Sequence, residues 1–254
     1  MSTGAYKIPP LTVHYQPVID LNTGGVAGAE ALLRFVRPDG TLVSPTVDGV
    51  IDSIEAEPET LLLLTERIFE CIARDAAPLL QRRSKFYIGV NIPPVILESG
   101  ALGRIHRVYQ LEPYLSRIVC EVTERQALTD IGRAALNRAH GEGIRIAIDD
   151  FGTGESQLKQ LIGLRFDILK IDRSHVAPLM KEPTADRLLR GIIALASSLR
   201  VKLTAEGVET REQAFFLRAA GVDCGQGWYW SGAHPISEFG KLLDQGFVDK
   251  QAWV

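Results

Sequence analysis

Short runs of β-branched and aromatic residues recur along the chain and alternate with longer segments of helical period. Such runs stand at Thr12–Val18, Val26–Phe35, Phe86–Ile92, Ile118–Thr123, Arg145–Asp149, Asp167–Ile171, Lys202–Ala205 and Asp223–Trp230. This alternation is typical of a mostly parallel sheet or barrel, and eight strands are the number that a closed barrel requires. The length of 254 residues suits such a barrel, which needs about 250 residues. We therefore predict an α/β fold, a (β/α)8 TIM-like barrel, as one domain over residues 1–254.

Three of the intervening segments have clear helical signatures. Glu59–Ala76 and Ala185–Leu199 place apolar residues three or four positions apart, which predicts helices with one buried face. We expect a third helix to begin at Thr210, which can form a capping box with Gln213, and to end at Gly221. The buried face of the second helix is expected to contain Leu188, Leu189, Ile192, Ile193, Ala196 and Leu199.

Charge, apolar stretches and cysteine content argue against several classes of protein. The formal net charge is −3 and no block of five like charges occurs, which argues against binding of a DNA or RNA polymer. The apolar stretch Gly191–Leu199 is far shorter than the roughly 20 residues of a membrane span, so we expect no membrane insertion. Residues 1–10 lack the apolar core of a secretory signal. The scattered cysteines indicate core thiols in a reducing compartment, and hence a cytoplasmic protein: Cys71, Cys120 and Cys224.

Polar residues interrupt the predicted strands close to their C-terminal ends. The chain carries acids, amides and two cations there, namely Glu30, Arg34, Asn91, Glu121, Glu124, Asp149, Asp150, Lys170, Asp172, Glu206, Glu209 and Gln226. In a (β/α)8 barrel the C-terminal ends of the strands converge on one face, where active sites of this fold are built. We therefore expect these side chains to meet in one site.

So many carboxylates in one place would repel one another unless cations neutralise them, which favours bound metal. The five histidines form no paired ligand spacing, so the ligands are oxygens, which favour Mg²⁺ or Mn²⁺ over zinc. Two such cations, about 4 Å apart, can activate a water and neutralise a phosphate, which points to phosphodiester hydrolysis. Arg34 could hold a phosphate oxygen, and Lys170 could orient or deprotonate the attacking water.

Each of these residues also has a structural interpretation when it is taken alone. A carboxylate at the end of a strand, such as Glu30, is commonly a helix cap or a solvated acid, and the two adjacent aspartates could cap the following turn. Lys170 could form a structural ion pair with Asp172 or Glu209. We expect the aromatic run Trp228–Trp230 to pack in the barrel core rather than to bind a ligand.

Motifs distributed over nearly the whole chain carry a family resemblance. They are Tyr15-Gln16-Pro17, Glu30-Ala31-Leu32-Leu33-Arg34, Asn91-Ile92, Glu121-Val122-Thr123-Glu124, Asp149-Asp150-Phe151-Gly152-Thr153-Gly154, Leu169-Lys170-Ile171-Asp172, Ala205-Glu206-Gly207-Val208-Glu209-Thr210 and Gln226-Gly227. With these motifs the sequence resembles the EAL-domain family of cyclic di-GMP phosphodiesterases. The resemblance implies the EAL variant of the barrel and hydrolysis of cyclic di-GMP to linear pGpG with two divalent cations.

The resemblance also implies roles for individual residues. One cation would be bound by Glu30, Asn91, Glu121 and Asp149, and a second by Asp149, Asp150 and Glu206. Catalysis would involve Glu206, Glu209 and Lys170, the last in contact with the attacking water. Substrate binding would involve Arg34 at a phosphate, Gln16 near a guanine, and Gln226, which with Glu209 supports the water shell of the metals. Family members commonly form homodimers, in which the loop after Asp150 links the interface to the metal site and is braced by Glu124.

Some segments depart from the family pattern. The loop after Asp150 contains Glu155-Ser156-Gln157 where active members usually carry Tyr-Ser-Ser, and the segment from Gln226 to Pro235 is slightly longer than usual. Two alternatives to the hydrolase therefore stay open. One is a catalytically weak domain that acts as a cyclic di-GMP receptor or a protein-interaction module. The other is a barrel hydrolase of another phosphodiester, such as a linear dinucleotide.

Overall fold

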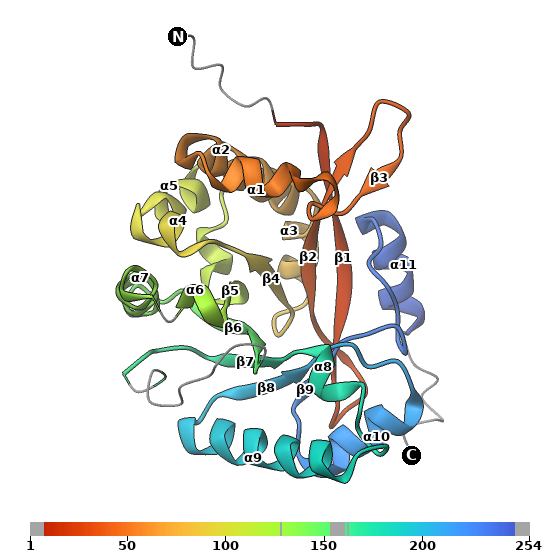
Figure 1. Cartoon of the computed structure of the whole chain (residues 1–254). Helices are drawn as coiled ribbons and strands as arrows, with labels where there is room; N and C mark the ends of the chain where they lie inside the picture. The colour runs from red at the N-terminus through yellow and green to blue at the C-terminus, as the bar shows by residue number, and fades with distance from the viewer. Residues whose placement is uncertain (1–7, 128, 153–160, 162, 247–254) are drawn as a thin grey trace.

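A closed barrel forms the centre of the molecule (Figure 1). The computed structural model describes residues 8–127, 129–152, 161 and 163–246. The barrel strands follow one another in the order β1-β9-β8-β7-β6-β5-β4-β2, and pairing of β1 with β2 completes the ring. Their bounds are β1 (Leu11–Asp20), β2 (Val26–Val36), β4 (Tyr87–Asn91), β5 (Ile118–Thr123), β6 (Arg145–Phe151), β7 (Ile168–Ile171), β8 (Lys202–Ala205) and β9 (Cys224–Gly225). A short strand, β3 (Leu42–Val43), pairs with β2 outside the ring. The predicted TIM-like α/β barrel is confirmed.

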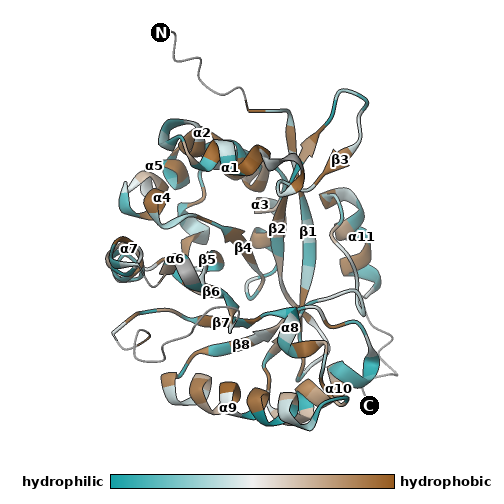
Figure 2. Ribbon diagram, in the orientation of Figure 1, coloured by the Kyte–Doolittle hydropathy of each residue, from teal (hydrophilic) through white to brown (hydrophobic). Residues whose placement is uncertain are grey.

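Helices cover the outside of the barrel (Figure 1). They are α1 (Val50–Glu55), α2 (Pro58–Asp75), α3 (Ala77–Arg82), α4 (Pro94–Glu98), α5 (Ala101–Val108), α6 (Glu124–Ala127), α7 (Asp130–Gly141), α8 (Arg173–Val176), α9 (Pro183–Leu199), α10 (Arg211–Ala220) and α11 (Ile236–Gln245), with 3₁₀ turns η1 (Val47–Gly49) and η2 (Glu112–Arg117). Figure 2 shows hydrophobic and hydrophilic stretches alternating along α9, as expected of a helix with one buried face.

The three helices predicted from the sequence are present as α2, α9 and α10. At α10 the capping box forms, because the Thr210 side chain accepts from Gln213 N and the Gln213 side chain accepts from Thr210 N. The expected buried face of α9 was wrong at Leu188, which is 50% exposed. Leu188 lies one position before the buried Leu189, and one position turns a helix by about 100°.

Strand β1 runs antiparallel to both of its neighbours, β2 and β9. A tight turn rather than a helix joins β1 to β2, and the Asp20 carboxylate stabilises it by accepting from Asn22 N and Thr23 N, each over 2.9 Å. The first strand pair is therefore a hairpin inside an otherwise parallel barrel. Its register places Gln16 directly opposite Glu30.

Strand β9 is much shorter than the predicted Asp223–Trp230, because it ends at Gly225. The chain then turns toward Val208, whose N–H donates to Gln226 O over 3.1 Å and whose carbonyl accepts from Tyr229 N over 3.0 Å. The expectation that the aromatic run packs in the core was wrong for Trp228, which is 77% exposed, whereas Trp230 is buried.

An apolar layer fills the lower part of the barrel interior. It consists of Val119, Ala147 and Ile168, with Tyr87 packed against them. Side chains alternate between the two faces of a strand, so the residues two positions further along point into the barrel as well, toward the C-terminal ends of the parallel strands. This layer is therefore the floor of any site at that end.

Two sequence expectations concern the environment of the chain. Within the described residues, none of the helices has the length and apolar character to cross a membrane. The cysteines Cys71, Cys120 and Cys224 are buried and free, as expected of core thiols.

Candidate active site

A charged layer lies directly above the apolar floor. Two positions beyond the floor residues, the inward faces of β5, β6 and β7 carry Glu121, Asp149 and Lys170. Glu30 reaches the same place from β2. Glu206, the residue directly after β8, reaches it as well. The structure thus brings together residues that are far apart in the sequence, as expected for strand ends that converge on one face.

Lys170 is the centre of this layer and is only 3% exposed. Its Nζ lies 2.5 Å from Glu121 Oε2 and 2.6 Å from Glu206 Oε1. It also lies 3.0 Å from Asp149 Oδ2 and 3.6 Å from Glu30 Oε2. Burial alone would lower the pKa of Lys170, but the surrounding carboxylates raise it well above its usual value. Lys170 is therefore an ammonium ion that faces four carboxyl groups.

One ammonium ion cannot neutralise four carboxylates, and the pKa values of the acids reflect this. Burial, with the neighbouring charges of Glu30 and Asp149, raises the pKa of Glu121 well above its usual value, against the opposing effect of Lys170. Burial likewise raises the pKa of Glu206 to about 8. Burial and the charge of Asp149 raise the pKa of Asp150. The layer therefore has an excess of negative charge, which further cations would relieve.

Among the residues that the structure describes, two groups of three carboxylates have the spacing of metal ligands. Glu30, Glu121 and Asp149 form one, and Asp149, Asp150 and Glu206 form the other, with the oxygen atoms of each group within 4.8 Å of one another. Asp149 belongs to both. The donors are oxygens, which suit hard divalent cations. The buried Gln226 Oε1 has no partner among the described residues and is a further oxygen free to accept. The residues present therefore fit a pair of metal ions.

Three amide side chains surround Glu30. Asn91 Nδ2 donates to Glu30 Oε1 over 3.1 Å, and Gln226 Nε2 donates to Glu30 Oε2 over 2.7 Å. Gln226 Nε2 also donates to Gln16 Oε1 over 3.0 Å. These residues come from β4, β1 and the position after β9, and all three lie beside the candidate site.

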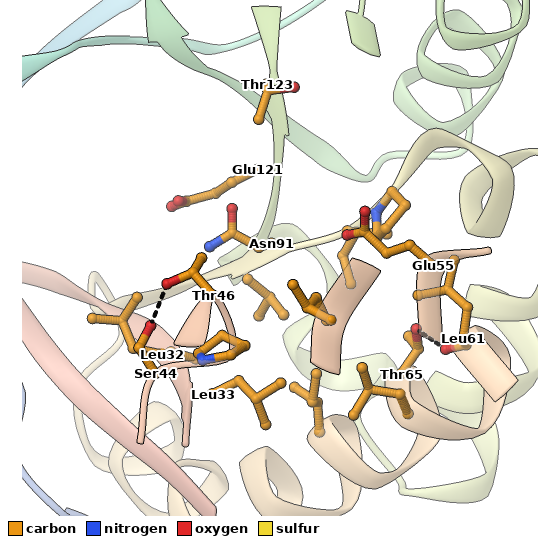
Figure 3. A pocket seen from close by; sticks show the side chains of 18 of the residues that line it. Leu32, Leu33, Ser44, Thr46, Glu55, Leu61, Thr65, Asn91, Glu121 and Thr123 are labelled. Atoms are coloured by element: carbon orange, nitrogen blue, oxygen red, sulfur yellow. Dashed lines mark hydrogen bonds between the residues drawn. The ribbon is translucent and has the colours of Figure 1, made fainter. Parts of the chain in front are cut away.

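A pocket of about 400 Å³ opens beside the carboxylates. Arg34 and Leu32 of β2 line it, and Asn91 and Glu121 lie at its boundary with the charged layer. In Figure 3 the carboxylate of Glu121 and the amide of Asn91 point to the same side. Arg34 Nη1 donates to Leu33 O, which holds the guanidinium at this pocket. A ligand here would lie next to the candidate metal ligands.

Other predicted residues lie further from the charged layer. Glu209 is exposed, and within the described residues no hydrogen bond or ion pair joins its carboxylate to this layer. Asp172 caps α8 by accepting from Ser174 N, which is a structural role. Glu124 is buried, and its Oε2 accepts from Gly152 N over 3.0 Å. The segment Glu155–Gln157 lies outside the described residues.

Gly89 of β4 is a site residue that the sequence analysis missed. A Cβ atom at this position would overlap the Glu121 carboxylate at Oε1. The signal was a glycine inside a strand, which often marks the close approach of another group. The space that Gly89 leaves is thus the space in which Glu121 reaches Lys170 and Asp149.

Replacing Gly89 with alanine is expected to weaken Mn²⁺ binding by about 10- to 100-fold, because the displaced Glu121 carboxylate no longer meets its partners. Calorimetric titration of the folded variant with Mn²⁺ measures the change. Gly103→Ala is the matched control, since a Cβ there meets open space. Equal Mn²⁺ affinities of the two variants would contradict the assignment of Gly89.

Metal binding is expected to strengthen as the pH rises from 6 to 8. A carboxyl group must lose its proton to bind metal, and with a pKa raised to about 8 Glu206 is largely protonated below that pH. The apparent affinity should rise by up to about tenfold per pH unit for each proton displaced. Titration at pH 7 in two buffers of different ionisation enthalpy counts the released protons. Glu206→Gln should release fewer protons, and a pH-independent affinity would refute the linkage.

Known proteins resemble this chain over most of its length. A sequence model of the family described as EAL domain matches residues 6–233. The chain is 36% identical over 244 residues to a protein of Escherichia coli K12 named probable cyclic di-GMP phosphodiesterase PdeB, covering 92% of this chain and 45% of PdeB. The chain thus spans less than half the length of this curated relative.

Solved structures resemble the fold closely. The EAL enzyme Bd1971, in its cAMP and cyclic-di-GMP bound form, superposes with a TM-score of 0.82 at 30% identity, over 92% of this chain and 64% of that one. A manganese and cyclic di-GMP complex of Klebsiella pneumoniae BlrP1 gives 0.75 at 26% identity, over 92% and 57%.

Proposed function

Because the chain belongs to the EAL domain family, we propose that it hydrolyses one phosphodiester bond of cyclic di-GMP and releases linear pGpG. The observation that carries the proposal is the pair of carboxylate groups that share Asp149 beside a pocket of about 400 Å³. Phosphodiester hydrolysis needs charge neutralisation and an activated water at one place, next to room for the rest of the substrate. The choice of substrate is supported by the name of the relative PdeB and by the nucleotide complexes of Bd1971 and BlrP1.

We propose two divalent cations, Mg²⁺ or Mn²⁺, as the cofactors. Glu30, Asn91, Glu121 and Asp149 would hold one, and Asp149, Asp150 and Glu206 the other. When bound, the pair supplies water activation and neutralises the phosphate. The short contact from Asn91 Nδ2 to Glu30 supports a place for Asn91 in the first set, and the manganese complex of BlrP1 supports the class of metal.

Side chains of this protein would hold the substrate and the water. Arg34 would bind a phosphate oxygen at the pocket, and Gln16 would contact a guanine. The raised pKa of Lys170 supports orientation of the attacking water through a donated hydrogen bond rather than removal of its proton. Gln226 would accept from a water through its Oε1, for which the described part of the chain offers no hydrogen-bond partner. Glu209 is proposed to assist this water shell on the family likeness alone.

We also propose that the chain forms a homodimer in the cytoplasm. The bond from Gly152 N to Glu124 supports a bracing role for Glu124 at the start of the loop that would link the dimer interface to the site. The buried free thiols support a reducing compartment. Sedimentation equilibrium measures the oligomeric state.

The test of the reaction is incubation of the purified chain with cyclic di-GMP and Mg²⁺ or Mn²⁺, followed by chromatography of the nucleotides. We expect pGpG to form, and to vanish with a chelator or in Glu30→Ala. Tight binding without turnover, with either metal, would refute the hydrolase and favour a receptor. Faster cleavage of linear pGpG than of cyclic di-GMP would instead identify a hydrolase of another phosphodiester.

A further inference from the structure

The Ser231–His234 loop lies against β1, immediately beside Gln16. Tyr15 N donates to His234 O over 2.7 Å, and His234 N donates to Tyr15 O over 3.0 Å. Tyr15 is fully buried and packs against Phe239 of α11, so this bridge has a rigid base. Because Tyr15 precedes Gln16 in β1, the bridge fixes the loop next to the Gln16 side chain.

Side chains close the same loop. Ser231 Oγ and His234 Nε2 are 2.7 Å apart, and His234 Nδ1 lies 3.1 Å from Glu238 Oε1 in α11. A carboxylate can only accept, so Nδ1 donates to Glu238, and the Ser231 hydroxyl can either donate to Nε2 or accept from it. The Glu238 side chain is 54% exposed, so water screens its contact with His234, whose side chain is 25% exposed. The contact between Ser231 and His234 is therefore the main closure of the loop.

The closed loop presents one backbone carbonyl to the active site. Ser231 O accepts from Gln16 Nε2 over 3.1 Å. A carbonyl can only accept, so it holds the nitrogen end of the Gln16 amide and leaves Oε1 for Gln226. Gln226 Nε2 then donates to both Gln16 Oε1 and Glu30 Oε2. With the Gln226 amide reversed, its oxygen would face the Glu30 carboxylate without a hydrogen between them, which costs energy.

We propose that Ser231 and His234 are positioning residues, which orient the Gln16 amide for cyclic di-GMP and, through it, the amide of Gln226. The proposal rests on the proposed function, in which Gln16 contacts the nucleotide. Neither side chain touches the candidate metal ligands in the described contacts. Glu30 is held independently by Asn91 and lies near Lys170. Loss of the loop closure should therefore weaken nucleotide binding and leave metal binding intact.

The test compares Ser231→Ala, which removes the hydroxyl and keeps the carbonyl, with Ser231→Thr, which keeps both. We expect Ser231→Ala and His234→Ala to raise KM for cyclic di-GMP by about fivefold, the effect of one ordinary hydrogen bond. The kcat and the Mn²⁺ affinity should stay within about twofold, and Ser231→Thr should restore KM. Ser99→Ala is the matched control, because its hydroxyl bonds to Ile96 O far from the site. If Ser231 and His234 had a merely structural role, their replacement would lower kcat or stability and would not raise KM alone.

A double-mutant cycle with Gln16→Ala tests whether the loop acts through Gln16. If it does, Ser231→Ala adds nothing to the rise in KM that Gln16→Ala causes. Multiplication of the two effects in the double variant would overturn the proposal. So would a normal KM in both Ser231→Ala and His234→Ala.

A measurement without nucleotide separates this proposal from the proposed function. In the free protein, nitrogen-15 NMR follows hydrogen exchange of the Gln16 side-chain NH₂, assigned by its loss in Gln16→Ala. We expect exchange to be about fivefold faster in Ser231→Ala and unchanged in Ser231→Thr. If the wild-type chain neither binds nor cleaves cyclic di-GMP, the proposed function fails, and this exchange rate still decides the role of the loop. Unchanged exchange in Ser231→Ala would overturn that role.

Discussion

Asp149→Asn should lower kcat for cyclic di-GMP by about 1,000-fold or more. Asp149 is the one residue that belongs to both candidate metal groups, and it also contacts Lys170 over 3.0 Å. Asparagine has the same shape and keeps one oxygen, but it removes the negative charge that would attract both cations. Initial rates of pGpG formation at saturating Mn²⁺ measure the effect, and calorimetric titration should detect weaker binding of Mn²⁺.

Asp223→Asn is the matched control for this prediction. Asp223 Oδ2 accepts from Leu203 N over 2.8 Å, near the start of β8 and thus at the opposite end of the barrel. The same chemical change there should leave kcat within about threefold, because Asp223 lies away from the candidate metal ligands and the oxygen of asparagine can still accept from Leu203 N. A rate loss below tenfold in Asp149→Asn would show that Asp149 is not the shared ligand.

Lys170→Met should affect stability and activity in different ways. Without metal, the variant leaves three buried carboxyl groups and the half-buried Glu206 without their cation. We expect the free energy of unfolding to fall by about 3 kcal/mol. Saturating Mn²⁺ should restore much of this stability, because the cations neutralise the same oxygens. The kcat should stay about 100-fold lower even then, since Lys170 is the donor that we propose to orient the attacking water.

Urea unfolding with and without Mn²⁺, together with rates of pGpG formation, tests this prediction. Lys202→Met is the control, because Lys202 is exposed at the start of the neighbouring strand β8. It should change neither quantity appreciably. Full activity of the metal-loaded Lys170→Met variant would leave Lys170 a purely structural counter-ion. The sequence left such a role open with Asp172 or Glu209 as the partner, whereas the contacts described for Lys170 are with Glu30, Glu121, Asp149 and Glu206.

Local signals explain where sequence reasoning succeeded. The capping box of Thr210 and Gln213 depends on neighbours within four residues, and it forms as predicted. Strands β5 and β8 have the predicted bounds. The convergence of Glu30, Glu121, Asp149 and Lys170 followed from a single rule about strand ends in barrels.

Contacts made in the folded chain explain where sequence reasoning failed. The run Trp228–Trp230 has high strand propensity, but pairing with Val208 turns the chain away after Gly225. Glu209 follows the same strand as Glu206, but Gly207 has φ = 64° and the Glu209 N–H donates to the Gln213 side chain. These contacts leave the Glu209 side chain at the surface. The pairing of Val208 with the segment after Gly225 could not be identified from spacing along the chain.

The reversed direction of β1 determines where an upstream domain would attach. In an all-parallel barrel the first strand begins at the end opposite the active site. Here Leu11 pairs with Phe35 near the C-terminal end of β2, and Pro10 O accepts from Val36 N. Strand β1 therefore begins at the end of the barrel that carries the candidate site. A sensor fused before Leu11, in nature or by engineering, would thus enter beside Arg34, and could act on the substrate mouth without relaying a signal through the barrel.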